Sequence, residues 1–160
     1  TYNGSTELGK YYYNTGNTSY TFTKDGSNGG ASDYSMTEVD SVNFQQGGTY
    51  AEGHGVVVES IVVKMIGDGE DKVYGTEPTD TPVAPGSYTI TMYASSLTAG
   101  WGQNATYELN ADNRAEVGFT ASGGQQRVML PESFDIDSCE SITVNIKSQT
   151  EPFNFQTYNG

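Results

Sequence analysis

Residues 86–109 read GSYTITMYASSLTAGWGQNATYEL, and this stretch decides the fold class. Over residues 87–94, large apolar side chains alternate with threonine and tyrosine, and a shorter alternation returns over residues 105–109. A period of two residues is typical of a half-buried β-strand. The sequence therefore predicts two strands, joined by a loop of about ten residues that carries the only tryptophan, Trp101.

The same alternation continues along the chain. Residues 56–66, VVVESIVVKMI, are the most apolar and β-branched stretch, which predicts a central strand. Residues 141–147 and 152–158 alternate most cleanly. Shorter strands are predicted within residues 1–17 and at residues 19–24, 36–44, 73–74, 115–121, 127–130 and 133–136. Turns separate these strands, so we expect one all-β domain of 160 residues, a two-sheet antiparallel β-sandwich of the jelly-roll type.

The composition limits the possible partners. Aspartate and glutamate number 20 against 7 lysines and arginines, which gives a net charge of -13. So acidic a surface repels phosphate backbones and anionic lipids, and we expect neither a nucleic-acid nor a membrane partner. The first residues lack a basic-then-apolar signal pattern. We interpret the chain as a mature, monomeric module cut from a larger multidomain protein.

Few residues are candidates for binding a metal. With Cys139 as the only cysteine and His54 as the only histidine, the chain lacks partners for an internal disulfide or a zinc site. We interpret His54 as a surface loop residue. Asp68, Glu70 and Asp71 lie among glycines and resemble a calcium loop in composition, although an acidic, solvated hairpin is the simpler interpretation. A structural calcium ion is the one cofactor that we consider.

Strand parity selects candidate binding residues, because the neighbours of core residues in a strand must face away from the core. The residues predicted to face outward in two of the strands are Thr89, Thr91, Tyr93, Asn154, Gln156 and Tyr158. If these strands share a sheet, its open face combines tyrosines with amides and hydroxyls. A sugar ring stacks its C–H face on an aromatic ring and needs both donors and acceptors for its hydroxyls. The alternative is that tyrosine and threonine are present as good strand formers.

Two aromatic residues in predicted loops extend this set. Trp101 lies between glycines and either contacts a ligand or folds under its loop as a core residue. Tyr50, in the loop GGTYAEGHG, has the same two interpretations. We predict a site with stacking residues Trp101, Tyr50, Tyr93 and Tyr158, and with hydrogen-bonding residues Gln103, Asn154, Gln156 and Arg127.

A catalytic function has weaker support in the residue pattern. A glycosidase needs two carboxylates across a cleft, and Glu59, Glu108 and Glu116 are strand residues that parity could place on an open face. However, a chain of this length barely completes a sandwich, and no Ser-His-Asp or Cys-His pattern is legible. We therefore expect no enzymatic activity in this module.

The second half of the chain, from GSYTITMYASS through WGQNATYELNADN to SITVNIKSQTEPFNFQTYNG, resembles the C-terminal strands of jelly-roll carbohydrate-binding modules of bacterial plant-cell-wall hydrolases. This resemblance implies a secreted, non-catalytic module that holds its parent enzyme on a polysaccharide such as a β-glucan or hemicellulose, sometimes with a structural calcium ion. Two alternatives remain: a surface adhesin that binds a protein, and a small polysaccharide-degrading enzyme.

Overall fold

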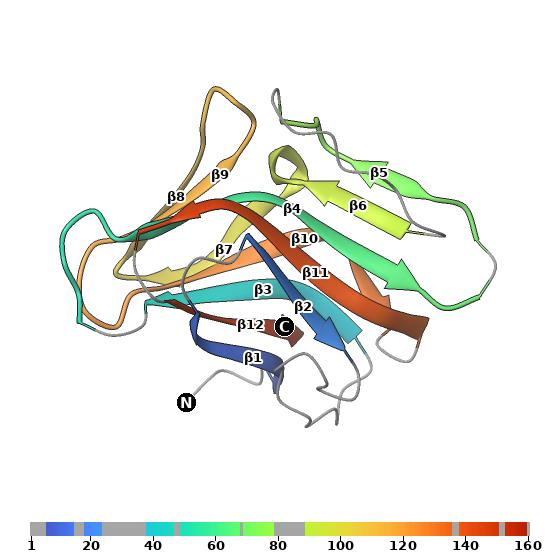
Figure 1. Ribbon diagram of the computed structural model, residues 1–160, viewed down its shortest axis with the longest axis horizontal. Helices are drawn as coiled ribbons and strands as arrows, with labels where there is room; N and C mark the ends of the chain where they lie inside the picture. Colours follow the sequence, from blue (N-terminus) through green and yellow to red (C-terminus); the bar gives the residue numbers. More distant parts are fainter. Residues whose placement is uncertain are drawn as a thin grey trace.

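The computed structural model describes residues 6–14, 18–23, 38–46, 49–67, 69–78, 89–135, 138–150 and 153–159. For residues 6–14, 22, 38 and 153–159 it describes the backbone alone. Two β-sheets face each other and enclose the hydrophobic core (Figure 1). This arrangement confirms the predicted β-sandwich, while the jelly-roll connectivity stays a prediction.

The first sheet has five strands, each antiparallel to its neighbours. In spatial order these are β1 (Thr6–Asn14), β12 (Phe153–Asn159), β3 (Glu38–Gln46), β10 (Gln125–Asp135) and β7 (Thr98–Gln103). The sheet therefore pairs the two ends of the described chain with each other, and β12 joins them to β3.

The second sheet has seven strands built around β4 (Gly55–Met65) and β11 (Cys139–Gln149). β2 (Ser19–Thr23) pairs with β11. The second half of β4 pairs with β6 (Thr89–Tyr93), which in turn pairs in parallel with β5 (Lys72–Tyr74). The first half of β4 pairs with β9 (Ala115–Phe119), and β9 with β8 (Ala105–Leu109). The hairpin formed by β8 and β9 thus extends the sheet at one end of β4.

The core fills the space between the two inner faces. Val42, Phe44 and Val128 come from the five-stranded sheet, and Ile61 and Val144 come from the other. Each of these side chains is almost fully buried, and burial of a residue of this size contributes about 1.5–3 kcal/mol relative to exposure. The predicted central strand at residues 56–66 is confirmed. β4 pairs with β11 along one edge and with β6 and β9 along the other.

The predicted loop around Trp101 is wrong, because residues 98–103 form β7 at the edge of the five-stranded sheet. A short 3-10 turn, η1 (Ala94–Ser96), separates β6 from β7. Asn104 has a positive φ of 50°, and at this residue the chain leaves one sheet and enters β8 of the other. The hydroxyl of Tyr107 donates to the carbonyl of Leu97 at 3.1 Å, which ties β8 to the start of β7.

The strand predicted at residues 127–130 and the described part of the strand predicted at residues 133–136 belong to one strand, β10. The register of β10 against β3 shifts between Met129 and Phe134. Pro131 lies in this irregular segment. Proline has no N–H to donate, and it is tolerated here because the regular hydrogen-bond ladder is already interrupted. No helix in the described ranges is long and apolar enough to span a membrane.

Candidate functional site

The outer face of the five-stranded sheet carries rows of amide residues that come from distant parts of the chain. In one row, Gln103 of β7 pairs with Gln125 of β10, Gln125 with Gln45 of β3, and Gln45 with Asn154 of β12. Four successive strands thus contribute one amide residue each at the same level. We call the outer surface of this sheet the amide face.

A second row runs beside the first. Arg127 of β10 pairs with Asn43 of β3, and Asn43 pairs with Gln156 of β12. On the other side of Arg127, the register of β7 contains an extra residue, so that Gly100 and Trp101 both stand opposite it. A third row contains Met129, Ser41 and Tyr158 in successive pairs.

The register therefore brings together six of the eight residues predicted for the site: Trp101, Gln103, Arg127, Asn154, Gln156 and Tyr158. Three strand spacings separate β7 from β12, a distance of about 14 Å. The side chains of Asn154, Gln156 and Tyr158 lie outside the described part of the structure, so these residues are placed by backbone register alone.

Exposure on the amide face rises from its centre towards β7. At the centre, Asn43 is 1% exposed and its Nδ2 donates to Oε1 of Gln125 at 3.3 Å. Gln125 is half-buried, Gln103 is exposed and Trp101 is 49% exposed. A ligand can therefore reach the β7 side of this face directly.

The prediction that Arg127 contacts the ligand is not supported, because its side chain is only 8% exposed. The register places it between Asn43 of β3 and the bulge at Gly100 and Trp101 of β7.

The glycines beside Trp101 leave room for two neighbouring side chains. The buried side chain of Gln126 donates from Nε2 to the carbonyl of Gly100 at 3.3 Å and to its neighbour Arg127 at 2.8 Å. A Cβ at Gly102 would collide with this amide, and a Cβ at Gly100 would lie 2.8 Å from Sδ of Met129. Gln126 thus holds the bulge that presents Trp101, and the sequence analysis did not single it out.

Tyr93 does not belong to the amide face. Its strand, β6, lies in the seven-stranded sheet, whereas Tyr158 lies in the five-stranded sheet. The side chain of Tyr93 is 9% exposed, and its pKa is raised first by this burial and then by the nearby charge of Glu77. Thr89 in the same strand is also buried. The predicted open face of β6 is therefore wrong, because Thr89 and Tyr93 are buried and Thr91 is half-buried.

Tyr50 and His54 form a structural pair in the connection between β3 and β4. Tyr50 is half-buried and packs against the core, with its ring centroid 6.0 Å from that of His54 in an edge-on contact. His54 is buried, and its Nδ1 accepts a hydrogen bond from the N–H of Ala51 at 3.2 Å. The interpretation of His54 as a surface residue is wrong, because its side chain is buried and its ring accepts a backbone hydrogen bond within this turn.

The acidic segment before β5 has a structural role in its described part. The carboxylate of Asp71 accepts the N–H of Thr89, which ties the start of β5 to β6. Glu70 is exposed, and Asp68 lies outside the described residues. Among the residues with described side chains, no group of three His, Cys, Asp or Glu residues is arranged to hold a metal ion.

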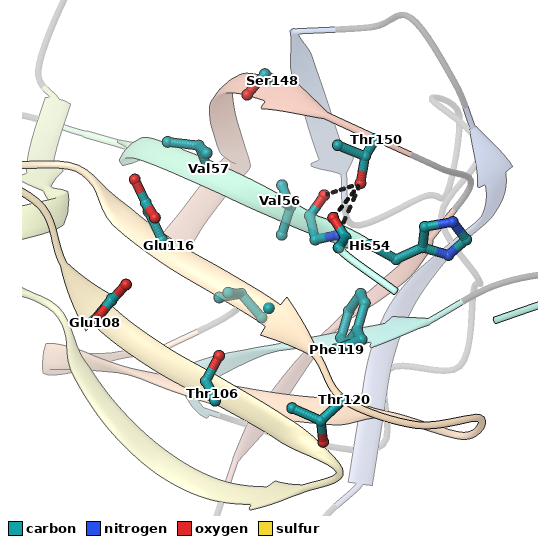
Figure 2. A pocket seen from close by; sticks show the side chains of 14 residues that line it. His54, Val56, Val57, Thr106, Glu108, Glu116, Phe119, Thr120, Ser148 and Thr150 are labelled. Atoms are coloured by element: carbon teal, nitrogen blue, oxygen red, sulfur yellow. Dashed lines mark hydrogen bonds between the residues drawn. The ribbon is translucent and has the colours of Figure 1, made fainter. Parts of the chain in front are cut away.

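Two of the three strand glutamates line a groove on the opposite sheet. The groove has a volume of about 310 Å³ and lies over β4, β8, β9 and the end of β11 (Figure 2). Glu108 and Glu116 form part of its wall. Glu59 is engaged elsewhere, since its Oε1 lies 3.0 Å from Nε of Arg114.

No protein-family model, no curated protein and no solved structure matches this chain.

Proposed function

We propose that the chain is a non-catalytic carbohydrate-binding module that holds a neutral plant-cell-wall β-glycan, a β-glucan or hemicellulose, against the amide face. The observation that supports this proposal is the row formed by Gln103, Gln125, Gln45 and Asn154 across four strands, with the exposed ring of Trp101 at its edge.

The chemistry of the row matches that of a sugar chain. Each amide offers two donors and one acceptor oxygen, and a sugar hydroxyl needs a donor and an acceptor at once. The Trp101 indole supplies a flat apolar surface for the C–H side of a sugar ring. One exposed tryptophan suits a single glycan chain better than a crystalline cellulose surface, which several co-planar rings would be needed to bind.

Charge favours a neutral glycan. The net charge of -13 repels polyanions such as pectin. The resemblance to modules of secreted plant-cell-wall hydrolases favours an extracellular location and an attached glycoside hydrolase, which this module would bring to its substrate.

Affinity electrophoresis through gels that contain β-glucan, xylan, mannan, galactan or pectin tests the proposal. We expect retardation in at least one neutral gel and none in pectin. Trp101→Ala and Gln103→Ala should each lower the affinity at least about fivefold. Each variant loses a contact that contributes about 1 kcal/mol, which corresponds to this change in affinity. Val73→Ala, which shortens an exposed side chain on the other sheet, is the matched control and should leave retardation unchanged.

Far-UV circular dichroism and thermal melting would establish that each variant is folded. Free migration through every gel would contradict the proposal. Retardation that survives both Trp101→Ala and Gln103→Ala would place the binding site away from the amide face.

A further inference from the structure

The groove on the seven-stranded sheet is built from two rows of residues on the outer side of that sheet. In the first row, Glu108 of β8 pairs with Glu116 of β9, and Glu116 pairs with Val57 of β4. In the second row, Thr106 of β8 pairs with Gly118 of β9, and Gly118 with Gly55 of β4. We call this site the glutamate groove.

Adjacent glycines create the hollow. Gly118 and Gly55 stand side by side on neighbouring strands, so the middle of the second row has no side chains. A Cβ at Gly55 would lie 2.5 Å from the carbonyl oxygen of Val117, and one at Gly118 would lie 2.8 Å from Oγ1 of Thr106. Thr150 fixes the backbone of Gly55 at the edge of the groove, because its Oγ1 accepts the N–H of Gly55 at 2.9 Å (Figure 2).

Within the described residues, the two groove carboxylates form no ion pair. Directly opposed residues on antiparallel strands have Cβ atoms about 4.5–5.5 Å apart, and like charges at such positions repel. Glu116 accepts a hydrogen bond from Nδ2 of Asn110 at 2.7 Å, which is a neutral donor. The groove lining contains no lysine or arginine, and neither Glu108 nor Glu116 has an ion pair within the described residues.

Three hydroxyls around the hollow are available to a ligand. The side chains of Thr106, Thr120 and Ser148 line the groove and have no hydrogen-bond partner among the described residues. Figure 2 shows Thr106 on the same side of the β8–β9 hairpin as Glu108 and Glu116. Val57, which is half-buried, contributes an apolar patch between the carboxylates and Ser148.

We propose that the glutamate groove binds one amino-sugar unit, with the ammonium group of the sugar between Glu108 and Glu116. An ionised carboxylate only accepts hydrogen bonds, so the ligand must bring donors, and a positive charge also relieves the repulsion between the two glutamates. The ring hydroxyls pair with the free threonine and serine hydroxyls, and Val57 contacts the apolar side of the ring. A volume of about 310 Å³ lies at the lower end of the range for ligand pockets, which suits a single small ring.

This site is separate from the amide face and does not depend on the function proposed for it. The two sites lie on different sheets, so variants of one leave the other unchanged and their failures can be told apart.

Titration of the ¹⁵N-labelled chain with glucosamine at about pH 6, where the sugar amine is protonated, tests the inference by amide chemical shifts. We expect the largest shifts at Thr106, Gly118 and Gly55. N-acetylglucosamine and glucose lack the positive charge, and each should bind at least about tenfold more weakly, because a hydrogen bond to a charged group contributes about 1.5–3 kcal/mol.

The double variant Glu108→Gln/Glu116→Gln keeps the shape of the groove and should lose at least about tenfold in affinity for glucosamine. Glu140→Gln removes the same charge from an exposed pair with Lys64 and is the matched control, which should bind as the unmodified chain does. Trp101→Ala should also leave glucosamine binding unchanged.

The inference is overturned if glucosamine causes no localised shifts, or if glucose binds as well as glucosamine. It is equally overturned if calcium chloride alone produces the same shifts and excludes glucosamine, because the carboxylates would then form a metal site. Melting temperatures of all variants would separate loss of binding from loss of folding.

Discussion

Nε of Arg114 lies 3.0 Å from Oε1 of Glu59, and both side chains are almost completely buried. The pair connects the residue before β9 to the middle of β4, on the outer side of the seven-stranded sheet. When one partner of a buried pair is removed, the other keeps its charge in an environment that solvates it poorly. This contact therefore ties the start of β9 to β4.

We predict that Arg114→Met lowers the free energy of unfolding by about 3–5 kcal/mol, because it removes the guanidinium that faces the buried Glu59 carboxylate. Urea denaturation measures this change. Lys64→Met, which breaks the exposed pair with Glu140, is the control and should cost at most about 1 kcal/mol. Equal losses in the two variants would contradict the prediction.

Gln126→Ala should disturb the bulge that presents Trp101. The substitution removes the donor to the carbonyls of Gly100 and Arg127, and loss of a buried hydrogen-bonding group costs about 1–3 kcal/mol. Because Trp101 is the only tryptophan, its fluorescence emission and its quenching by acrylamide report the environment of β7 directly. Gln125→Ala, on the opposite side of β10, should change stability less. An unchanged emission spectrum in Gln126→Ala would show that the bulge does not need this amide.

Cys139 should be unreactive in the folded chain. Burial raises the pKa of its thiol to about 11, with the charge of Asp135 acting in the same direction, so the reactive thiolate is scarce at pH 8. A thiol-reactive disulfide reagent should modify Cys139 only after denaturant unfolds the chain. Rapid modification of the native chain would contradict the described burial.

The same thiol makes stability depend on pH in the alkaline range. Because the folded pKa is raised, the native state keeps a proton that the unfolded state loses, and the contribution of Cys139 is fully present below its ordinary pKa. This contribution is lost as the pH rises towards about 11. Denaturation at several pH values should show that stability falls less steeply with rising pH in Cys139→Ala than in the unmodified chain. Between the ordinary thiol pKa and about 11, the two slopes should differ by up to about 1.4 kcal/mol for each pH unit.

Glu108→Gln should stabilise the fold, because it removes one of two like charges that face each other across β8 and β9. The expected gain is about 0.2–1 kcal/mol in the free energy of unfolding at low salt. High salt should reduce the gain by screening the repulsion in the unmodified chain. A loss of stability would indicate that Glu108 has a partner that compensates its charge.

Local patterns predicted most of the strands but misplaced the connection between β6 and β8. β4 and β11 were recognisable because both lie inside a sheet, where one face of the strand is buried along its length. The residues of β7 were not, since an edge strand with two glycines and an exposed Trp101 lacks the alternation that burial imposes.

The candidate site shows the same division. Trp101 and Gln103 could be selected from the sequence as residues without a place in the core, and both are exposed. Gln45 and Gln125, which complete their row, were not selected, because an amide in a strand has no local signal that distinguishes a ligand contact from an ordinary surface position. Tyr93 was selected, but its side chain is buried. The prediction failed because parity assigns a side chain to a face of the sheet without showing what covers that face.

By itself, the sequence determined that this chain is all-β, strongly acidic and supplied with aromatic and amide residues outside the core, since a period of two and net charge are properties of the chain read in order. Only the tertiary structure decided which of those residues meet. Gln103, Gln125, Gln45 and Asn154 form one row because β7, β10, β3 and β12 pair in one register, and Glu108 faces Glu116 for the same reason. Register between distant strands depends on how the whole core packs, which no local stretch encodes.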